Sequence, residues 1–180
     1  MTALLQATRR ELGLASDLLA GIDDETFTRP CLLVFDGSVG KHVRHNLDHY
    51  HSFLAGLSSG VVDYDQRARS QRVERSREMA LAALETVTAH VSELTHHDRK
   101  LRIRLHSPRP GGGECCEPSP AWAESTVQRE LAFLLSHTVH HHAIIAIIAR
   151  YLGADIDPQF GVARATLVHA MRANGQALGD

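Results

Sequence analysis

The sequence predicts an all-α protein, a four-helix bundle, and two observations support this prediction. The first is the spacing of the apolar residues, which recur every three or four positions along four separate segments, as in helices that bury one face. The second is the composition, because only 5% of the 180 residues are aromatic. The core must therefore consist mainly of Leu, Ile, Val and Ala, as in many bundles. A chain of this length can build one core, and we expect a single domain over residues 1–180.

Start and stop signals place the four helices along the chain. We expect them at residues 2–22, 38–57, 71–95 and 130–153. Thr2 and Ser38 are candidate N-caps of the first and second helices, and Gly153 is a stop signal for the fourth. Residues 23–37 are expected to form a turn-rich connection, and residues 58–70 a polar loop.

The longest connection, residues 96–124, joins the third and fourth helices and is expected to carry a short β-hairpin. The stretch KLRIRLHS alternates polar and apolar residues, which predicts a strand, and residues 122–126 are candidates for the returning strand. The Gly- and Pro-rich tip between them contains Cys115 and Cys116, which we expect to be an exposed, oxidisable pair without a role. Beyond the fourth helix we expect one short helix over residues 163–171 and a frayed end.

Charge and composition argue against several classes of protein. The formal net charge is −2, without the basic excess that is typical of nucleic-acid binding. The N-terminus carries charges too early for a signal peptide, and histidines interrupt the apolar run of the fourth helix before it reaches the roughly 18 residues of a membrane span. The three cysteines form no CxxC pair, which suits a reducing compartment. We therefore expect a cytoplasmic protein that binds neither nucleic acid nor membrane.

The fourth helix also predicts self-association. Ile144, Ile145, Ile147 and Ile148 cover most directions around it. A helix that is apolar on nearly all sides is either central in its fold or shared with a second subunit. We expect a homodimer.

Thirteen histidines are many for this length, and four of them fall within six positions of the fourth helix. His137 and His141 share one face of that helix with Leu134, Ile144 and Ile148. Each imidazole in such an apolar stripe costs on the order of 1–3 kcal/mol if it stays unpaired. A divalent metal is one partner that removes this cost, because HxxxH on a helix presents two ring nitrogens to the same ion. Such a site needs at least a third ligand.

The second helix offers that third ligand. His42, His45 and His49 step by three or four positions and share a face with Phe53 and Leu57. In a bundle, metal ligands project inward from facing helices, so either His45 or His49 is expected to complete the site with the HxxxH pair. Three neutral imidazoles leave coordination positions open for water or substrate, which is typical of catalytic metal sites.

Other polar side chains are candidates for supporting roles. His49, Asp48 and His140 are candidates for a general base or for a group that orients a ligand ring, as carboxylates often do beside a metal. The loop after the second helix offers candidates that can hold an anionic substrate group, namely Tyr64, Arg67 and Arg69. Each of these residues also has an ordinary interpretation, as a surface side chain or part of a solvated loop.

Two motifs of this chain resemble one family. HVRHNLDHYHSFL in the second helix and SHTVHHHAIIAIIARYLG in the fourth look like the corresponding segments of the DinB/YfiT-like family of metalloenzymes, and the resemblance covers nearly the whole chain. It implies a four-helix bundle with one histidine ligand from the second helix, which falls on His45, with His49 one turn on. It also implies an HxxxH ligand pair from the last helix, which falls on His137 and His141. Many members continue with Arg-Gly-Gln where this chain has His142, Ala143 and Ile144.

The resemblance implies a bound divalent metal, commonly nickel or zinc, and a small-molecule substrate. Some relatives look like transferases or isomerases that use a low-molecular-weight thiol such as bacillithiol or mycothiol, and others look like hydrolases. A metal held by three histidines suits both, because it can lower the pKa of bound water toward about 7 or deprotonate a thiol. We therefore expect a mononuclear metal-dependent hydrolase or thiol-dependent S-transferase.

Two alternative functions remain open at this point. A hemerythrin-like di-iron sensor is also a histidine-rich bundle, but its site needs bridging carboxylates, and Asp48 is the only carboxylate near the second-helix histidines. A non-enzymatic bundle would use a metal, or buried hydrogen-bonded histidines, for structure or for partner binding. Mutation of the histidines would then cost stability and no turnover.

Overall fold

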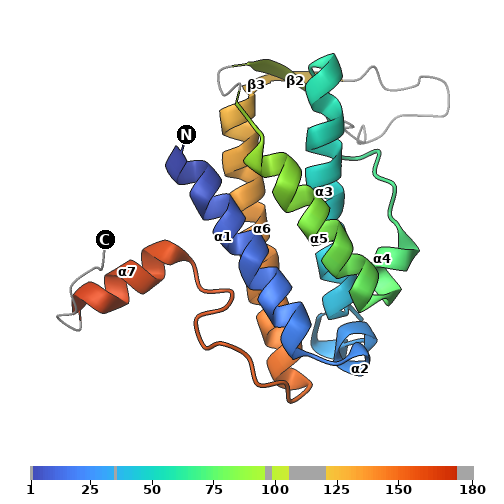
Figure 1. The fold of residues 1–180 in the computed structure, drawn as a ribbon, viewed down its shortest axis with the longest axis vertical. Helices are drawn as coiled ribbons and strands as arrows, with labels where there is room; N and C mark the ends of the chain where they lie inside the picture. Colours follow the sequence, from blue (N-terminus) through green and yellow to red (C-terminus); the bar gives the residue numbers. More distant parts are fainter. Residues whose placement is uncertain (1, 35, 96–98, 106–120, 174–180) are drawn as a thin grey trace, which may run out of the picture.

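The structure is a computed structural model that describes residues 2–34, 36–95, 99–105 and 121–173, and these are mostly helical (Figure 1). Its body is formed by four long helices: α1 (Thr2–Gly21), α3 (Val39–Ser59), α5 (Arg77–Ser92) and α6 (Val127–Tyr151). Helix α1 packs on α5 and α6, and α3 packs on the same two helices. The core is built mainly from aliphatic side chains with a few buried rings, as the composition predicted. The expected helical bundle is therefore present.

The ends of the helices follow local signals. Ser38 caps α3 as expected, because its hydroxyl oxygen accepts a hydrogen bond from the backbone N–H of Lys41 at 3.1 Å. Thr126 caps α6 in the same way through the backbone N–H of Arg129 at 3.2 Å, so this helix starts three residues earlier than expected. Gly153 follows the end of α6 with φ at 85°, in the left-handed region that glycine adopts most readily.

The expected third helix is in fact two helices. A short helix, α4 (Gln71–Arg75), is separated from α5 by Ser76, whose backbone is extended with φ at −128° and ψ at 113°. The Ser76 hydroxyl accepts a hydrogen bond from the backbone N–H of Met79 and caps α5. A serine competes with a continuing helix because its side chain can replace a backbone hydrogen bond. The prediction of one helix over residues 71–95 is wrong for that reason.

The connection between α1 and α3 contains two short elements, α2 (Asp24–Thr28) and the 3-10 helix η1 (Leu32–Val34). Helix α6 contacts η1. Four large apolar side chains are exposed on η1 and α6, namely Leu32, Leu33, Ile147 and Tyr151. Exposed apolar surface of this kind is common at protein interfaces, and the homodimer stays a prediction.

A small three-stranded sheet lies at one end of the bundle (Figure 1). The expected hairpin is present, because β2 (Lys100–Leu105) and β3 (Ala121–Thr126) pair antiparallel. A third strand, β1 (Val61–Asp63), pairs parallel with β2 and corrects the prediction that residues 58–70 are only a loop. Three residues are too few to show an alternating pattern. Because β1 directly follows α3 and β3 directly precedes α6, the sheet ties the end of α3 to the start of α6 and makes these neighbours antiparallel.

The chain beyond α6 ends in α7 (Arg164–Ala173), close to the expected range, and α7 lies to one side of α1 (Figure 1). Cys31 is buried and free. The Cys115–Cys116 pair lies outside the described residues, as does most of the end that was expected to fray.

Helix α6 is long and apolar enough, with a mean hydropathy of 1.5, to meet the composition criterion for a membrane-crossing helix. The core helix of a soluble bundle meets the same criterion, and α6 packs on both α1 and α3.

Candidate metal centre

Three of the predicted histidines come together where α3 faces α6. His45 projects from α3, and His137 and His141 project from successive turns of α6. Their ring centroids lie 5.2 Å, 4.7 Å and 4.5 Å apart, for the pairs 45–137, 45–141 and 137–141. One ligand nitrogen from each ring can be chosen so that all three lie within 4.8 Å of one another. These three side chains, which we call the metal-binding group, are therefore close enough to hold a metal ion.

The nitrogen atoms of the α6 pair have a spacing that suits a shared ion. The Nε2 atoms of His137 and His141 lie 3.2 Å apart. Two imidazoles that bind zinc at 2.0–2.1 Å with tetrahedral angles have their nitrogens about 3.4 Å apart. In addition, Nδ1 of His137 is buried and has no hydrogen-bond partner in the described part of the chain. The residues present thus fit a divalent ion.

The partners of His49 bear on whether His45 or His49 is the candidate ligand from α3. Its Nδ1–H donates to the backbone carbonyl of His45 at 2.9 Å, and its Nε2 accepts a hydrogen bond from a guanidinium nitrogen of Arg67 at 2.9 Å. Both ring nitrogens of His49 are therefore engaged. The ring still packs against His137, with centroids 4.1 Å apart, and so borders the site. The geometry favours His45 as the ligand from α3.

Burial keeps the three clustered imidazoles neutral. The pKa of His45 is lowered to about 4, that of His137 to about 3 and that of His141 to about 2, against an ordinary value of 6.5. Burial is the main cause in each case and neighbouring imidazoles add to it, as does the Arg67 guanidinium for His45 and His137. Neutral imidazoles have a free nitrogen lone pair, which is the form that binds metals.

The other predicted supporting residues have different positions. Asp48 is buried, but its carboxylate accepts a hydrogen bond from Arg44 at 2.9 Å, so its partner is a guanidinium rather than the ligand ring that the sequence suggested. His140 is exposed and meets His141 edge-on, with centroids 5.2 Å apart. Arg69 is exposed, with φ at 48°. Of these three residues, only His140 touches the metal-binding group.

Tyr64 borders the site and leads to a buried carboxylate that the sequence analysis did not assign. Its ring stacks on His49 with centroids 5.6 Å apart, and its hydroxyl donates to Glu130 at 2.7 Å. Glu130 is only 2% exposed and also accepts hydrogen bonds from Ser125 and Arg129. A glutamate in the first turn of a helix usually faces solvent, so its position in the sequence did not indicate burial.

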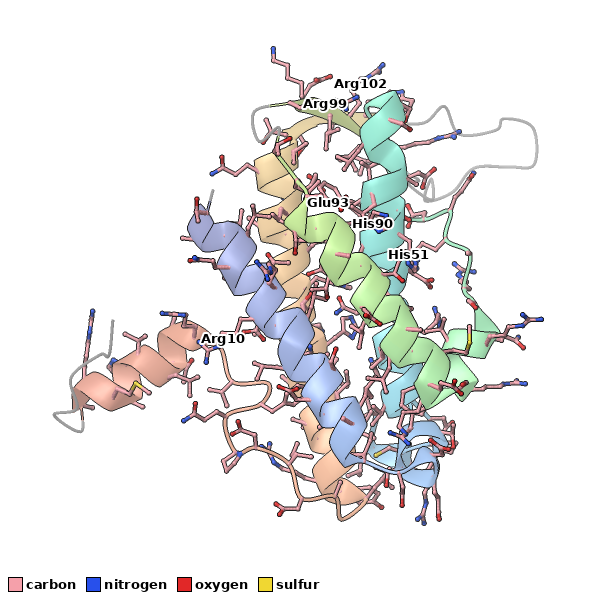
Figure 2. All side chains as sticks on the ribbon, viewed as in Figure 1. Arg10, His51, His90, Glu93, Arg99 and Arg102 are labelled. Atoms are coloured by element: carbon pink, nitrogen blue, oxygen red, sulfur yellow. The ribbon has the colours of Figure 1, made fainter. Side chains whose placement is uncertain are left out.

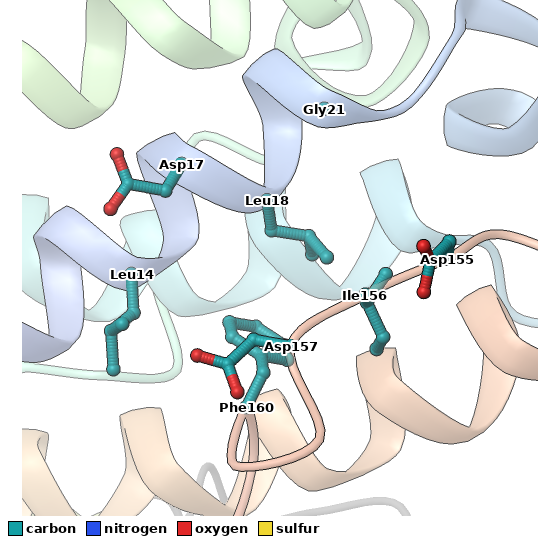
Figure 3. A pocket seen from close by; sticks show the side chains of 8 residues that line it. All are labelled: Leu14, Asp17, Leu18, Gly21, Asp155, Ile156, Asp157 and Phe160. Atoms are coloured by element: carbon teal, nitrogen blue, oxygen red, sulfur yellow. The ribbon is translucent and has the colours of Figure 1, made fainter.

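An open cavity of about 290 Å³ lies beside the histidines, between the sheet and the start of α6. Phe133 lines this cavity, and its ring centroid lies 5.7 Å from that of His137. Apolar side chains line much of it, including Ile103, Leu105 and Ala123, with Tyr64 and Arg129 among the polar ones. A second cavity, of about 170 Å³, lies between α1 and the segment after α6 and carries three aspartates but none of the site histidines (Figure 3).

A buried polar network lies next to the histidine layer. Tyr50 and Asn46 of α3 both meet the hydroxyl of Thr138 on α6, at 2.9 Å and 3.3 Å. Burial raises the pKa of the Tyr50 hydroxyl, so this group is neutral. Buried polar groups are costly when unpaired, so the network favours the one alignment of α3 against α6 that satisfies them. That alignment also brings the histidines of the two helices together.

His51 of α3 is not part of the histidine layer. It is exposed and lies with His90 where α3 meets α5 (Figure 2). The helical period accounts for this, because His51 lies off the face that carries the other three α3 histidines.

Comparison of the chain with family models, with curated proteins and with solved structures found no match in any of the three.

Proposed function

We propose that the protein is a mononuclear metal enzyme of the DinB-like type, a hydrolase or a thiol-dependent S-transferase, in which His45, His137 and His141 hold one nickel or zinc ion. The observation that supports this most directly is the meeting of three neutral imidazoles from two facing helices. When bound, such an ion lowers the pKa of a coordinated water or thiol and so supplies a nucleophile at neutral pH.

The charges around the site favour an anionic substrate group. The Arg67 guanidinium contacts His49 at 2.9 Å. The two buried carboxylates of the region are already engaged, Asp48 by Arg44 and Glu130 by Tyr64. A positive ion and a guanidinium attract a carboxylate or a thiolate. A low-molecular-weight thiol has this chemistry.

The neighbouring cavity suits the rest of such a substrate. Its wall near the histidines is formed by Phe133 and Tyr64, whose ring centroids lie 5.4 Å apart. Its volume of about 290 Å³ is at the lower end for a small-molecule pocket. We assign this cavity to the apolar part of the substrate, with the reacting group directed past Phe133 toward the histidines.

The di-iron alternative has little support. Among the described residues, the group of side chains that could hold a metal contains three histidines and no carboxylate. The non-enzymatic alternative has one observation in its favour. The Nε2 atoms of His137 and His141 are within hydrogen-bonding distance, so these rings can also satisfy each other without an ion.

Metal analysis separates these functions. The protein is purified without a His-tag or nickel resin, and its metal content is measured beside that of a His137→Ala/His141→Ala variant. A His51→Ala/His90→Ala variant is the matched control, because it removes two histidines outside the cluster. We expect about one equivalent of nickel or zinc in the wild type and in the control, and none in the first variant.

Three results would contradict the proposal. Absence of bound metal from all the proteins after incubation with either ion would support a structural role for the histidines. Two equivalents of iron would support the di-iron sensor. Equal metal in all the proteins would place the ion elsewhere. With one equivalent present, hydrolysis and thiol-transfer screens with that metal test the enzymatic part.

A further inference from the structure

A fourth histidine contacts His141 at the ring nitrogen that does not face His137. His42 lies one turn before His45 on α3, and its Nδ1 is 3.1 Å from Nδ1 of His141. The two ring centroids lie 5.3 Å apart. The other ring nitrogen of His141, Nε2, is the one that faces His137. His141 therefore has one nitrogen toward the candidate metal centre and one toward His42.

A hydrogen bond between the two Nδ1 atoms requires a proton on one of them and a lone pair on the other. A neutral imidazole carries a proton on one nitrogen and a lone pair on the other. If His141 carries its proton on Nδ1, it donates to His42, and its Nε2 lone pair points toward the metal centre. If the proton belongs to His42 instead, the neutral His141 ring carries its own proton on Nε2, where it blocks the ion. Only the first arrangement makes His141 a metal ligand.

We propose that His42 is a positioning residue whose Nδ1 accepts the Nδ1–H of His141 and so holds the Nε2 lone pair of His141 toward the metal. This inference rests on the metal site of the proposed function. Metal-binding histidines usually donate their other N–H to a carboxylate, a backbone carbonyl or water, and such partners fix the tautomer and the ring orientation. Here an imidazole on the facing helix has that place.

The loop before α3 supports the position of His42. A Cβ atom on Gly37 would lie 2.7 Å from Nε2 of His42 and 2.8 Å from the backbone oxygen of Val34. The backbone at Gly37 therefore lies directly against the His42 ring, and a larger residue there would displace it. Helix α6 is on the other side of the ring, so His42 is held between the two.

His137 has no comparable support. Its Nδ1 is buried without a hydrogen-bond partner among the described residues. Of the α6 pair, His141 alone has a partner on the nitrogen that faces away from the centre. We therefore expect the orientation of the pair to depend on His42.

The test compares the zinc affinities of two His42 variants by competition with a chelating dye. Asn at position 42 has an oxygen as many bonds from the backbone as Nδ1 of histidine, so His42→Asn keeps an acceptor, whereas His42→Leu removes it. We expect His42→Leu to bind zinc about 10–100-fold more weakly than the wild type and His42→Asn to bind nearly as well. His51→Leu and His51→Asn, on the exposed side of the same helix, are the matched controls and should bind as the wild type does.

Each other outcome overturns the inference. Wild-type affinity in His42→Leu would mean that the acceptor does not matter. Equal losses in both His42 variants would mean that the imidazole itself is needed, as a ligand or for packing. Absence of zinc binding by the wild type would remove the proposed function and this inference together, so the two failures are distinguishable.

A second measurement does not depend on how well a variant folds. Nitrogen-15 NMR of the zinc-loaded wild type shows which ring nitrogen of His141 carries the proton. We expect the proton on Nδ1 and the metal on Nε2. Metal coordination through Nδ1 of His141 would overturn the proposal.

Discussion

Two adjacent histidines of α6 lie in opposite environments. His141 faces α3, where its ring nitrogens lie 3.2 Å from His137 and 3.1 Å from His42. His142 faces α1, where its Nδ1–H donates to the carboxylate of Glu11 at 3.2 Å. Both side chains are buried, so burial alone does not separate a candidate metal ligand from a structural histidine.

The partner makes the difference. Glu11 accepts a hydrogen bond from His142, and the ring of Phe160 stacks on the same imidazole with centroids 4.7 Å apart. Nε2 of His142 has no hydrogen-bond partner among the described residues, so His142 differs from the clustered histidines in having a carboxylate beside it. On the α3 side the neighbours are other imidazoles and Arg67, and none of them favours a protonated ring. A group of neutral nitrogens with few donors between them is the environment that a metal ion satisfies.

The largest expected effect is the loss of stabilisation by zinc, and we expect it only when the histidines of α6 that face α3 are replaced. An ion that binds only the native state adds about 2.7 kcal/mol to the free energy of unfolding at 100 times its Kd. We expect zinc to produce this increment in the wild type and in His142→Gln, and to have no effect on His137→Ala/His141→Ala. Urea unfolding with and without zinc measures it. An equal increment in all three proteins would erase the contrast between the two faces.

The second-largest effect is a loss of stability expected on the face of α6 that packs against α1. Glu11→Leu removes the acceptor of His142 and leaves a buried N–H unpaired, at a cost of about 1–3 kcal/mol in the free energy of unfolding. Zinc affinity should stay at the wild-type value, since Glu11 does not contact the metal-binding group. The contrast fails if this substitution leaves stability unchanged or weakens zinc binding.

Acid should destabilise the metal-free protein through the three histidines of the metal-binding group. Burial first, and then neighbouring charges, lower the pKa values of His45, His137 and His141 to about 4, 3 and 2, below the ordinary 6.5. The unfolded chain therefore binds more protons than the native protein as the pH falls. The contribution of these histidines to the free energy of unfolding is fully present above pH 6.5 and is lost as the pH falls toward the native pKa values.

Urea midpoints measured between about pH 7 and pH 5 test this expectation, because the unfolded histidines protonate in that window. The midpoint should fall less steeply with acid in His137→Ala/His141→Ala than in the wild type. Parallel slopes would show that these histidines do not carry the effect.

The smallest effect is expected at His140, which meets His141 only edge-on from the surface. His140→Ala should change the free energy of unfolding by no more than about 0.5 kcal/mol, as surface substitutions usually do. Zinc affinity should change little. A large loss of affinity would instead place His140 within the site.

Much of this arrangement could be predicted from local sequence signals. Helical spacing placed the long helices, Ser38 was recognisable as a cap, and the HxxxH of α6 with His45 indicated three rings that the structure brings together. These features depend on residues a few positions apart. The break at Ser76 was missed because the apolar spacing continues through it, and β1 because three residues show no period.

The missed functional details depend on contacts between distant segments. Sequence placed His42 on the same face as His45 but could not show that its Nδ1 meets His141, because that contact depends on the alignment of α3 against α6. The same holds for Tyr64 and Glu130, which meet only because the sheet joins α3 to α6. Asp48 was a candidate for orienting a ligand ring or for an ordinary surface position, whereas it is buried and its carboxylate accepts a hydrogen bond from Arg44 on its own helix.

The most direct test of the metal site is a crystal structure of the zinc-loaded protein with anomalous scattering recorded at the zinc edge. We predict a single strong peak within bonding distance of His45, His137 and His141, with His142 still paired to Glu11. A peak elsewhere, two peaks bridged by carboxylates, or no peak at this group would contradict it.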